Sequence, residues 1–247
     1  MSHPQGSRPS FQFTHDADAS DRLVAGFSSF GLAGVTAANY LVDRLDLAET
    51  GHVTTEALPS ITPFEDGVPR HHTRLFSRPS SDLSVLVNEL FVPLPAADPF
   101  SESVLDWAAR NGVSEITVLA GVPVEHGPDD HRTFYVATED YREACLADEP
   151  LPPMGSGFLD GVNAGLVGQG MESDLRVGVL LTPVHEQVPD VEASIRLLDA
   201  AEAVLGVDVD TGALEAFAAE VRQYYRELAE RFERAEEAHR PEDRMYV

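Results

Sequence analysis

The chain contains no lysine: all 17 of its basic residues are arginines, against 42 aspartates and glutamates. Its formal net charge at pH 7 is therefore -25, and the acidic residues are spread along the sequence instead of forming one block. Binding to the phosphates of nucleic acids or to an anionic membrane surface requires clustered cations. We therefore expect neither a nucleic acid nor a membrane as a partner.

Cysteine and long apolar runs are also scarce. Cys145 is the only cysteine among 247 residues, which excludes an internal disulfide and a multi-cysteine metal site. No uninterrupted apolar run reaches the ~18 residues needed to cross a bilayer. Residues 1–10 are polar and lack the apolar segment of a secretion signal. We expect a cytoplasmic protein whose residues 1–10 are disordered.

The excess of negative charge indicates the ionic strength at which the protein is stable. A folded chain this acidic repels itself when ionic strength is low. In 1 M salt the Debye length falls to about 3 Å, and most of that repulsion is screened. The composition therefore predicts a halophilic protein from a salt-rich cytoplasm, which loses stability when salt is removed.

The apolar residues are sufficient for one large domain, since they make up 43% of the chain. Strand-like apolar runs alternate with helical segments, which is typical of a mostly parallel sheet with helices on both faces. We predict an α/β domain over residues 11–210. Its expected strands are 11–15, 22–27, 53–58, 82–91, 116–120, 133–137 and 177–182, and its expected helices are 31–45, 101–111, 161–171 and 191–205.

The first glycine cluster lies between an expected strand and an expected helix, and contains Gly26, Ser28, Ser29, Gly31 and Gly34. Because a phosphate can bind at the N-terminus of such a helix, these residues form a candidate ligand loop. The segment nevertheless lacks the Gly-Lys-Ser/Thr of a P-loop and the spacing G-x-G-x-x-G. A tight strand-to-helix turn with close packing is the favoured interpretation.

No other group of residues has the spacing of a catalytic or metal site. A second glycine cluster over residues 155–170 has no lysine or acid at an informative offset, so close helix packing explains it. His71 and His72 are adjacent and would point to opposite faces of a strand. No histidine spacing suits a structural zinc site. We therefore predict no metal, no cofactor and no catalytic residue, and assign Cys145 to core packing.

The end of the chain combines a helix with an unusual apolar terminus. Apolar residues recur at steps of three and four from Leu214 to Leu228, and they place one stripe on a helix over residues 211–240. Pro241 ends that helix, and residues 241–247 form a flexible acidic segment that finishes in Met245, Tyr246 and Val247. These three residues either fold back onto the domain or bind in the pocket of a partner.

Several short motifs follow one another in a fixed order over residues 20–210: Val24–Phe27 with Gly31–Gly34, Thr55–Pro59, Phe64–Pro69, Val104–Ala108, Val118–Pro123, Gly157–Gly165, Leu181–Pro183 and Pro189–Ala193. Their order and spacing resemble the archaeal proteasome assembly chaperone family of the second type. The resemblance implies a three-layer α/β/α sandwich related to nucleoside phosphorylases, but without their catalytic site. It also implies a homo-oligomer that assists assembly of the 20S proteasome core.

Some members of that family end in a hydrophobic-Tyr-X tail that inserts between adjacent α-subunits of the 20S core. The resemblance maps this tail onto Met245 as the hydrophobic residue, Tyr246 as the tyrosine and Val247 as the free C-terminus. An assembly chaperone, a proteasome activator and an adaptor would all use the same tail, so these three roles stay open. The alternative from another class is a nucleoside-phosphorylase-like or hydrolase-like enzyme that works at the loop from Gly26 to Gly34.

Overall fold

The computed structural model describes residues 11–79, 81–124, 127, 130–147, 151–185 and 189–219. The chain divides into two compact units, Met1–Val209 and Asp210–Val247. The predicted disordered segment 1–10 and the predicted tail 241–247 lie outside the described residues, as does most of the predicted C-terminal helix. In the second unit, residues 212–219 are helical.

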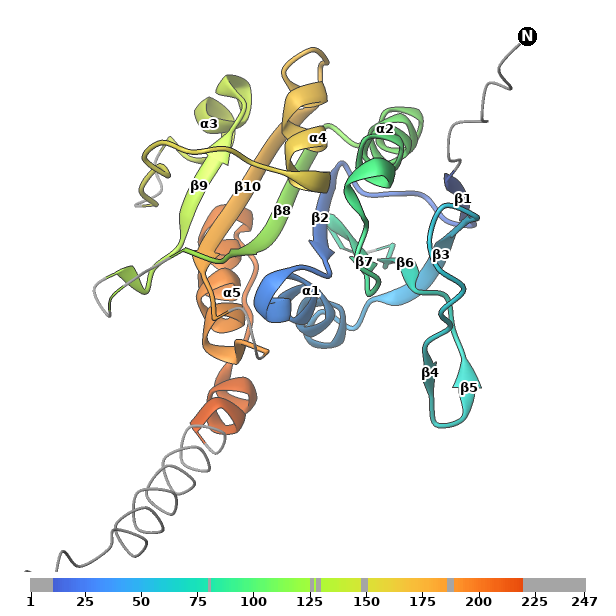
Figure 1. The fold of residues 1–247 in the computed structure, drawn as a ribbon, viewed down its shortest axis with the longest axis horizontal. Coiled ribbons are helices and arrows are strands. Elements are labelled where there is room, and N and C mark those ends of the chain that lie inside the picture. The colour runs from blue at the N-terminus through green and yellow to red at the C-terminus, as the bar shows by residue number, and fades with distance from the viewer. Residues whose placement is uncertain are drawn as a thin grey trace, which may run out of the picture. The chain divides into compact units, whose positions relative to one another are not determined.

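An eight-stranded sheet forms the centre of the first unit, with the strand order β1-β3-β6-β7-β2-β8-β10-β9 (Figure 1). A separate two-stranded hairpin, β4-β5, is inserted before β6. The strands are β1 (Phe11–His15), β2 (Arg22–Phe27), β3 (Ala48–Thr55), β4 (Phe64–Glu65), β5 (Val68–Pro69), β6 (Thr73–Ser77), β7 (Leu83–Asn88), β8 (Glu115–Val122), β9 (Phe134–Ala137) and β10 (Arg176–Pro183).

The four central strands β7, β2, β8 and β10 are parallel to one another. These strands are almost entirely buried, in agreement with the continuous apolar runs from which they were predicted. On one side, β6, β3 and β1 continue the sheet in antiparallel pairs, and β9 is antiparallel to β10 on the other. The sheet is therefore mixed, with a parallel centre as predicted and antiparallel margins that the sequence pattern did not predict.

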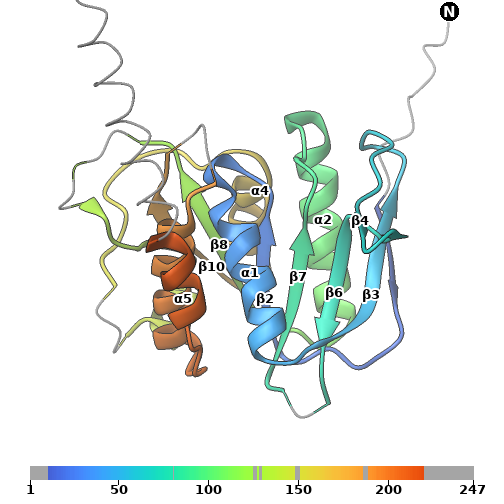
Figure 2. The same ribbon diagram turned by 90° about the horizontal axis from the view of Figure 1, so that it is seen from below.

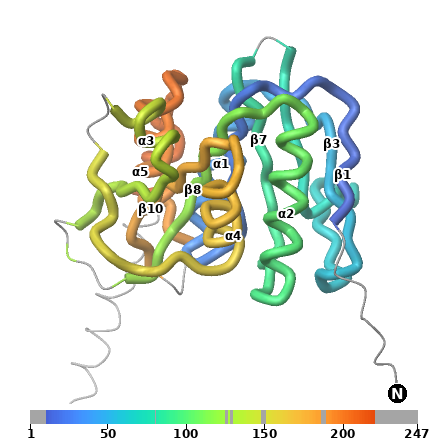
Figure 3. The backbone as a smooth tube through the Cα atoms, turned by 90° about the horizontal axis from the view of Figure 1, so that it is seen from above, coloured from blue at the N-terminus to red at the C-terminus, as the bar shows by residue number. Residues whose placement is uncertain are grey.

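Helices cover both faces of this sheet, so the unit has the three layers of an α/β/α sandwich. Figure 2 shows the face with α1 (Ala33–Arg44) and α5 (Val191–Leu205), which pack against each other. Figure 3 shows the opposite face with α2 (Leu94–Arg110) and α4 (Gly161–Gly170), which also pack together. A short helix, α3 (Glu139–Cys145), contacts β10.

Local sequence explains where α5 begins and ends. The side chain of Asp190 accepts a hydrogen bond of 2.9 Å from the backbone N–H of Ala193, which is the arrangement of a helix N-cap. At the other end, Gly206 adopts the left-handed conformation with φ of 65°, which costs little for glycine. The predicted helix over residues 191–205 is therefore confirmed at both ends.

Two predicted elements, α2 and β3, differ most from the structure in their boundaries. Helix α2 begins at Leu94, before the expected residue 101, although Pro95 and Pro99 lie in its first two turns. Pro95 is tolerated at the second helical position because the first N–H groups have no partner within the helix, whereas Pro99 lies inside the helix. Strand β3 covers 48–55 where 53–58 was expected, and its ladder with β6 is interrupted by an irregularity between Glu49 and Gly51.

A hydrophobic core cluster lies between the sheet and the α2–α4 layer, where Phe100 is completely buried. The ring of Phe100 contacts that of Phe11 at 4.9 Å between centroids and that of Phe27 at 5.7 Å. These contacts join the helix α2 to the strands β1 and β2 and fix the sheet edge beside which the candidate site lies. None of the helices that the structure describes is long and apolar enough to span a membrane.

Candidate functional site: a recess at the carboxyl ends of β2 and β8

A recess of about 840 Å³ opens beyond the carboxyl ends of the parallel strands β2 and β8. Four segments that are distant in the sequence form its wall: residues 27–30 after β2, 91–94 between β7 and α2, 119–124 at the end of β8, and 154–163 before and within α4. The volume lies in the usual range for small-molecule sites, roughly 300–1,000 Å³.

The position of the recess follows from the connections of the sheet. After β2 the chain enters α1 on one face, whereas α4, which follows β8 and leads into β10, lies on the opposite face (Figures 2 and 3). Because the two connections diverge, the loops after neighbouring strands separate and leave a crevice at this edge. Such switch points are the usual ligand sites of open α/β sheets.

The candidate ligand loop of the sequence divides between two roles. Ser28 and Ser29 line the recess. Gly26 and Gly34 instead allow α1 to pack closely: a Cβ added at Gly34 would lie 2.0 Å from the carbonyl oxygen of Leu119, and one added at Gly26 would lie 2.4 Å from Cβ of Ala38. Close packing therefore explains both glycines, as the favoured interpretation expected.

Gly31 has a different requirement from the other glycines of this loop. Its φ is 66°, in the left-handed region that favours glycine, and a Cβ at this position would lie 2.8 Å from Cβ of Val184. Its carbonyl oxygen accepts a hydrogen bond of 2.8 Å from the backbone N–H of Asp190. The turn between β2 and α1 is thus tied to the start of α5.

The second glycine cluster also contributes to the recess. Gly155, Gly157 and Gly161 line it, and a Cβ at any of the three would meet no atom within 4 Å. Gly165 and Gly170, farther along α4, pack closely against Ser101 and Val177. The helix-packing explanation from the sequence therefore holds for Gly165 and Gly170, whereas Gly155 and Gly157 belong to an open loop beside the recess and Gly161 begins α4.

The floor of the recess is apolar, with Phe27, Ala120 and Leu181 buried beneath it. Three of the polar side chains in its wall are Ser28 and Ser29 from the β2–α1 turn and Asn163 from the first turn of α4. Within the described part of the chain, these three side chains form no hydrogen bond. They are open to a ligand in a way that most half-buried polar groups are not.

The recess contains little charge. Asp160, the N-cap residue of α4, is the only ionisable side chain among its lining residues as described, and its carboxylate does not cap the helix. No arginine or histidine lines the described wall. A phosphate would therefore find no cationic side chain there, and the phosphate interpretation of the glycine loop receives no support.

Large apolar side chains surround the mouth of the recess. Phe91 and Leu94 are 64% and 67% exposed, and Phe158, which also lines the recess, is fully exposed. Exposed aromatic groups that gather at one opening are uncommon on a soluble protein surface and usually mark a place where something binds.

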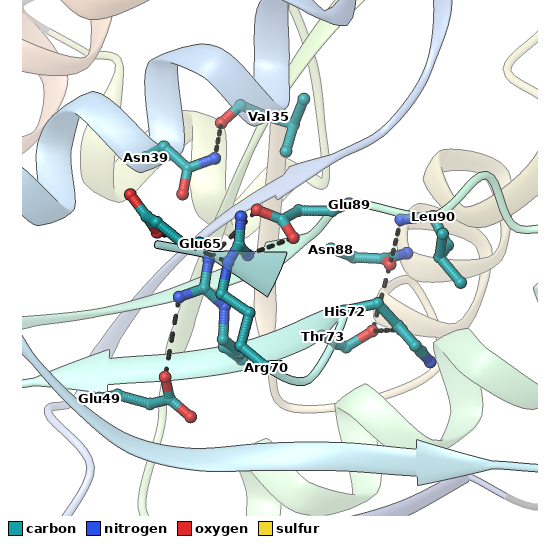
Figure 4. A network of polar contacts seen from close by, with 11 residues as sticks. Val35, Asn39, Glu49, Glu65, Arg70, His72, Thr73, Asn88, Glu89 and Leu90 are labelled. Carbon is teal, nitrogen blue, oxygen red and sulfur yellow. Dashed lines mark hydrogen bonds and ion pairs between the residues drawn. The ribbon is translucent and has the colours of Figure 1, made fainter. Parts of the chain in front are cut away.

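A second polar region lies at the same edge of the sheet, near β6 and β7 (Figure 4). Arg70, which follows the hairpin β4-β5, and Arg74 in β6 both pair with the carboxylate of Glu89; the Arg74–Glu89 distance is 3.2 Å. Glu49 lies 3.7 Å from Arg74, and Glu65 lies 3.6 Å from Arg70. We call these five residues the arginine–glutamate network. Each charge in this network has a partner of opposite sign, although Nε of Arg70 and Nε of Arg74 are buried and form no hydrogen bond among the described residues.

Histidines lie beside this network. The rings of His52 and His71 stack at 3.7 Å between centroids, and Nδ1 of His72 lies 2.8 Å from Oγ1 of Thr73. Burial lowers the pKa of His71, and the neighbouring His52 lowers it further. Burial likewise lowers the pKa of His72, with a smaller contribution from His71. No group of three metal-ligating residues occurs among the described residues, so this cluster is not assigned as a metal site.

Cys145 and His185 make contacts that are typical of residues that stabilise the fold. The thiol of Cys145 donates a 3.0 Å hydrogen bond to Glu115, and burial together with this contact raises its pKa to about 12. A thiol with so high a pKa is a poor nucleophile. His185 contacts the carboxylate of Asp190 at 2.9 Å. Burial alone would raise the pKa of Asp190, but hydrogen bonds from Ala193 and His185 outweigh it and lower that pKa.

Comparison with known proteins places this fold among solved structures. PbaA of Pyrococcus furiosus, described as an archaeal homologue of proteasome-assembly chaperone, is 18% identical, with a TM-score of 0.81 over 93% of this chain and 95% of PbaA. PbaB of the same organism, described as an archaeal proteasome activator, is 19% identical, with a TM-score of 0.74 over 89% of this chain and 99% of PbaB.

A proteasome-assembly chaperone homologue of Mycobacterium tuberculosis is 19% identical, with a TM-score of 0.61 over 85% of this chain and 94% of its own. At these identities the likeness establishes the fold. No curated protein matches the chain. The model of the PAC2 family matches residues 23–229, which is most of the sequence and includes β2 from its second residue and every later strand up to β10. The chain therefore belongs to the PAC2 family.

Proposed function

We propose that the protein is a non-enzymatic partner of the proteasome, either an assembly chaperone or an activator or adaptor. The observation that carries this proposal is membership of the PAC2 family, together with the fold shared with PbaA and PbaB over about nine-tenths of the chain. Both of those relatives are described by a proteasome role. The wider expectation of a nucleoside-phosphorylase-like fold is part of the same proposal.

The contact we propose is made by Met245, Tyr246 and Val247, which would dock between adjacent α-subunits of the 20S core. The tyrosine ring offers apolar area with a polar tip, and the terminal carboxylate can pair with a cation in the pocket. Eight residues from Arg240 reach roughly 26 Å when extended, which allows a tail to search for its pocket.

A single tripeptide binds weakly, so the proposal includes a homo-oligomer that presents several tails. Linking several weak contacts raises the overall affinity by about 10²- to 10⁴-fold when their spacing matches the sites. With a net charge of -25, the protein is proposed to work in a salt-rich cytoplasm. There the carboxylate contact keeps its strength only if it is buried, since exposed pairs are screened.

The test is a pull-down of 20S cores in molar salt by the full chain, by a chain lacking Met245–Val247, and by Tyr246→Ala. We expect both changes to abolish binding while thermal unfolding and oligomer size stay unchanged. The matched control is Asp243→Ala, which alters the same segment outside the motif. Undiminished binding by Tyr246→Ala would refute the role of the tail.

The chaperone and activator roles separate in a second measurement. A chaperone should bind free α-subunits or half-assembled particles and speed their assembly. An activator should bind the mature core and raise its rate of peptide hydrolysis. The nucleoside-phosphorylase alternative is not proposed, because the described wall of the recess lacks a cation for phosphate.

A further inference from the structure

We propose that the recess beyond β2 and β8 binds a largely apolar small molecule that has no negative charge and carries a hydrogen-bonding group. This site is separate from the proposed proteasome contact, because the recess is lined by residues 27–181 and the docking motif is Met245–Val247. Success or failure of the tail in the pull-down therefore says nothing about the recess.

Two independent features of the fold indicate a ligand site. The recess lies where the connections after β2 and β8 diverge to opposite faces of the sheet, which is where open α/β sheets place their ligands. It also has a volume of about 840 Å³, enough for a molecule of several rings. Neither feature depends on the identity of any single residue.

The chemistry of the wall selects the ligand class. Buried Phe27, Ala120 and Leu181 form an apolar floor that stabilises rings or chains by removing them from water. Ser28, Ser29 and Asn163 in the wall keep their hydroxyl and amide groups without partners in the described chain, so a polar group of the ligand would find both donors and acceptors.

The charges in the wall of the recess exclude an anionic ligand. An anionic group would enter an apolar space without a described cation and beside the carboxylate of Asp160, and so would lose hydration without gaining a partner. The exposed Phe91, Leu94 and Phe158 at the mouth would close over an apolar ligand and lose exposed area as they do so. We therefore infer a ligand without negative charge, which enters between these three side chains.

The experiment compares two dyes that differ in one sulfonate. N-phenyl-1-naphthylamine is neutral, and anilinonaphthalene sulfonate has the same rings with a negative charge. Titrations of the full chain are followed by dye fluorescence in molar salt, where the general repulsion of anions by an acidic protein is screened. We expect one saturable site for the neutral dye and at least tenfold weaker binding of the sulfonate.

A matched pair of variants locates the dye. Asn163→Trp places an indole in the first turn of α4 at the wall of the recess, whereas Gln169→Trp places the same group on the same helix outside the recess. We expect the dissociation constant of the neutral dye to rise at least tenfold in Asn163→Trp and to stay unchanged in Gln169→Trp. If Asn163→Trp lowers the unfolding temperature, Gly157→Trp on the open loop replaces it.

Three outcomes would overturn the proposal. Equal binding of both dyes would show a general apolar surface and not a neutral site. Binding that is unchanged in both Asn163→Trp and Gly157→Trp would place the dye elsewhere. Release of the dye as the protein concentration rises and copies associate would show that the recess is a contact between copies of the chain.

Discussion

The arginine–glutamate network and the recess lie at the same end of the sheet, where the parallel strands β7, β2 and β8 finish. They differ in whether their polar side chains have partners. In the network, Arg70 and Arg74 share the carboxylate of Glu89 and the charges are paired, although Nε of each arginine forms no hydrogen bond among the described residues. In the recess, Ser28 and Ser29 are uncharged and make no side-chain hydrogen bond within the described chain. Paired charges stabilise the fold, whereas hydroxyl groups without partners are free to bind a ligand. This difference distinguishes a structural region from a candidate site.

Removing the shared carboxylate should produce the largest effect. Glu89→Ala leaves two guanidinium groups, which are 25% and 11% exposed, without their common partner. Breaking a buried pair costs about 3–5 kcal/mol and an exposed one little, so we expect a loss of roughly 2 kcal/mol in the free energy of unfolding. Chemical denaturation in molar salt measures it.

The control for this variant is Glu65→Ala. Glu65 belongs to the same network, but its side chain is 74% exposed. We expect a change below about 0.5 kcal/mol for this variant. Equal effects of the two changes would mean that the network does not stabilise the fold through its half-buried charges.

Acidification should lower the stability of the region around the arginine–glutamate network, where His71 and His72 lie, by a moderate amount. The pKa values of His71 and His72 are lowered from 6.5 on folding, so the unfolded chain takes up more protons as the pH falls through that range. Stability is therefore highest above pH 6.5 and should decline between pH 7.5 and 5.5. His72→Gln should make this decline shallower, as followed by thermal unfolding at several pH values. An unchanged slope would remove His72 from the explanation.

The smallest effect on stability is expected in the recess. The double change Ser28→Ala and Ser29→Ala removes two hydroxyls that have no described partner, so the free energy of unfolding should move by less than about 0.5 kcal/mol. Affinity for N-phenyl-1-naphthylamine should nevertheless fall by about threefold, the value of one modest hydrogen bond. A large loss of stability with unchanged affinity would reverse the proposed roles of the two regions.

Much of this fold could be predicted because its centre obeys simple patterns. The strands β2 and β10 and the helix α5 have continuous apolar runs or clear caps, and their predicted positions agree with the structure to within a residue. The strand β6 was not predicted, because its sequence Thr-Arg-Leu-Phe-Ser is short and includes the charged Arg74. That arginine is tolerated in the strand because Glu89 and Glu49 pair with it.

The candidate site was harder to predict than the fold. Ser28 and Ser29 were identified from a strand-to-helix turn, but as part of a phosphate loop and without Asn163. The other wall lies more than 100 residues later, in a loop whose glycines give no periodic signal. Only the sheet topology brings these segments together. Phe91 and Phe158, the exposed aromatic residues at the mouth of the recess, likewise follow no sequence pattern that distinguishes them from core residues.

The high pKa of Cys145 has a practical consequence for labelling. A thiol whose pKa is about 12 instead of 9.0 holds about a thousandfold less thiolate near neutral pH, and thiolate is the form that reacts with maleimides. A cysteine introduced beside Tyr246 should therefore be modified long before the native one. The natural chain already serves as a single-label background for following the tail by fluorescence or spin probes, with Cys145 left in place.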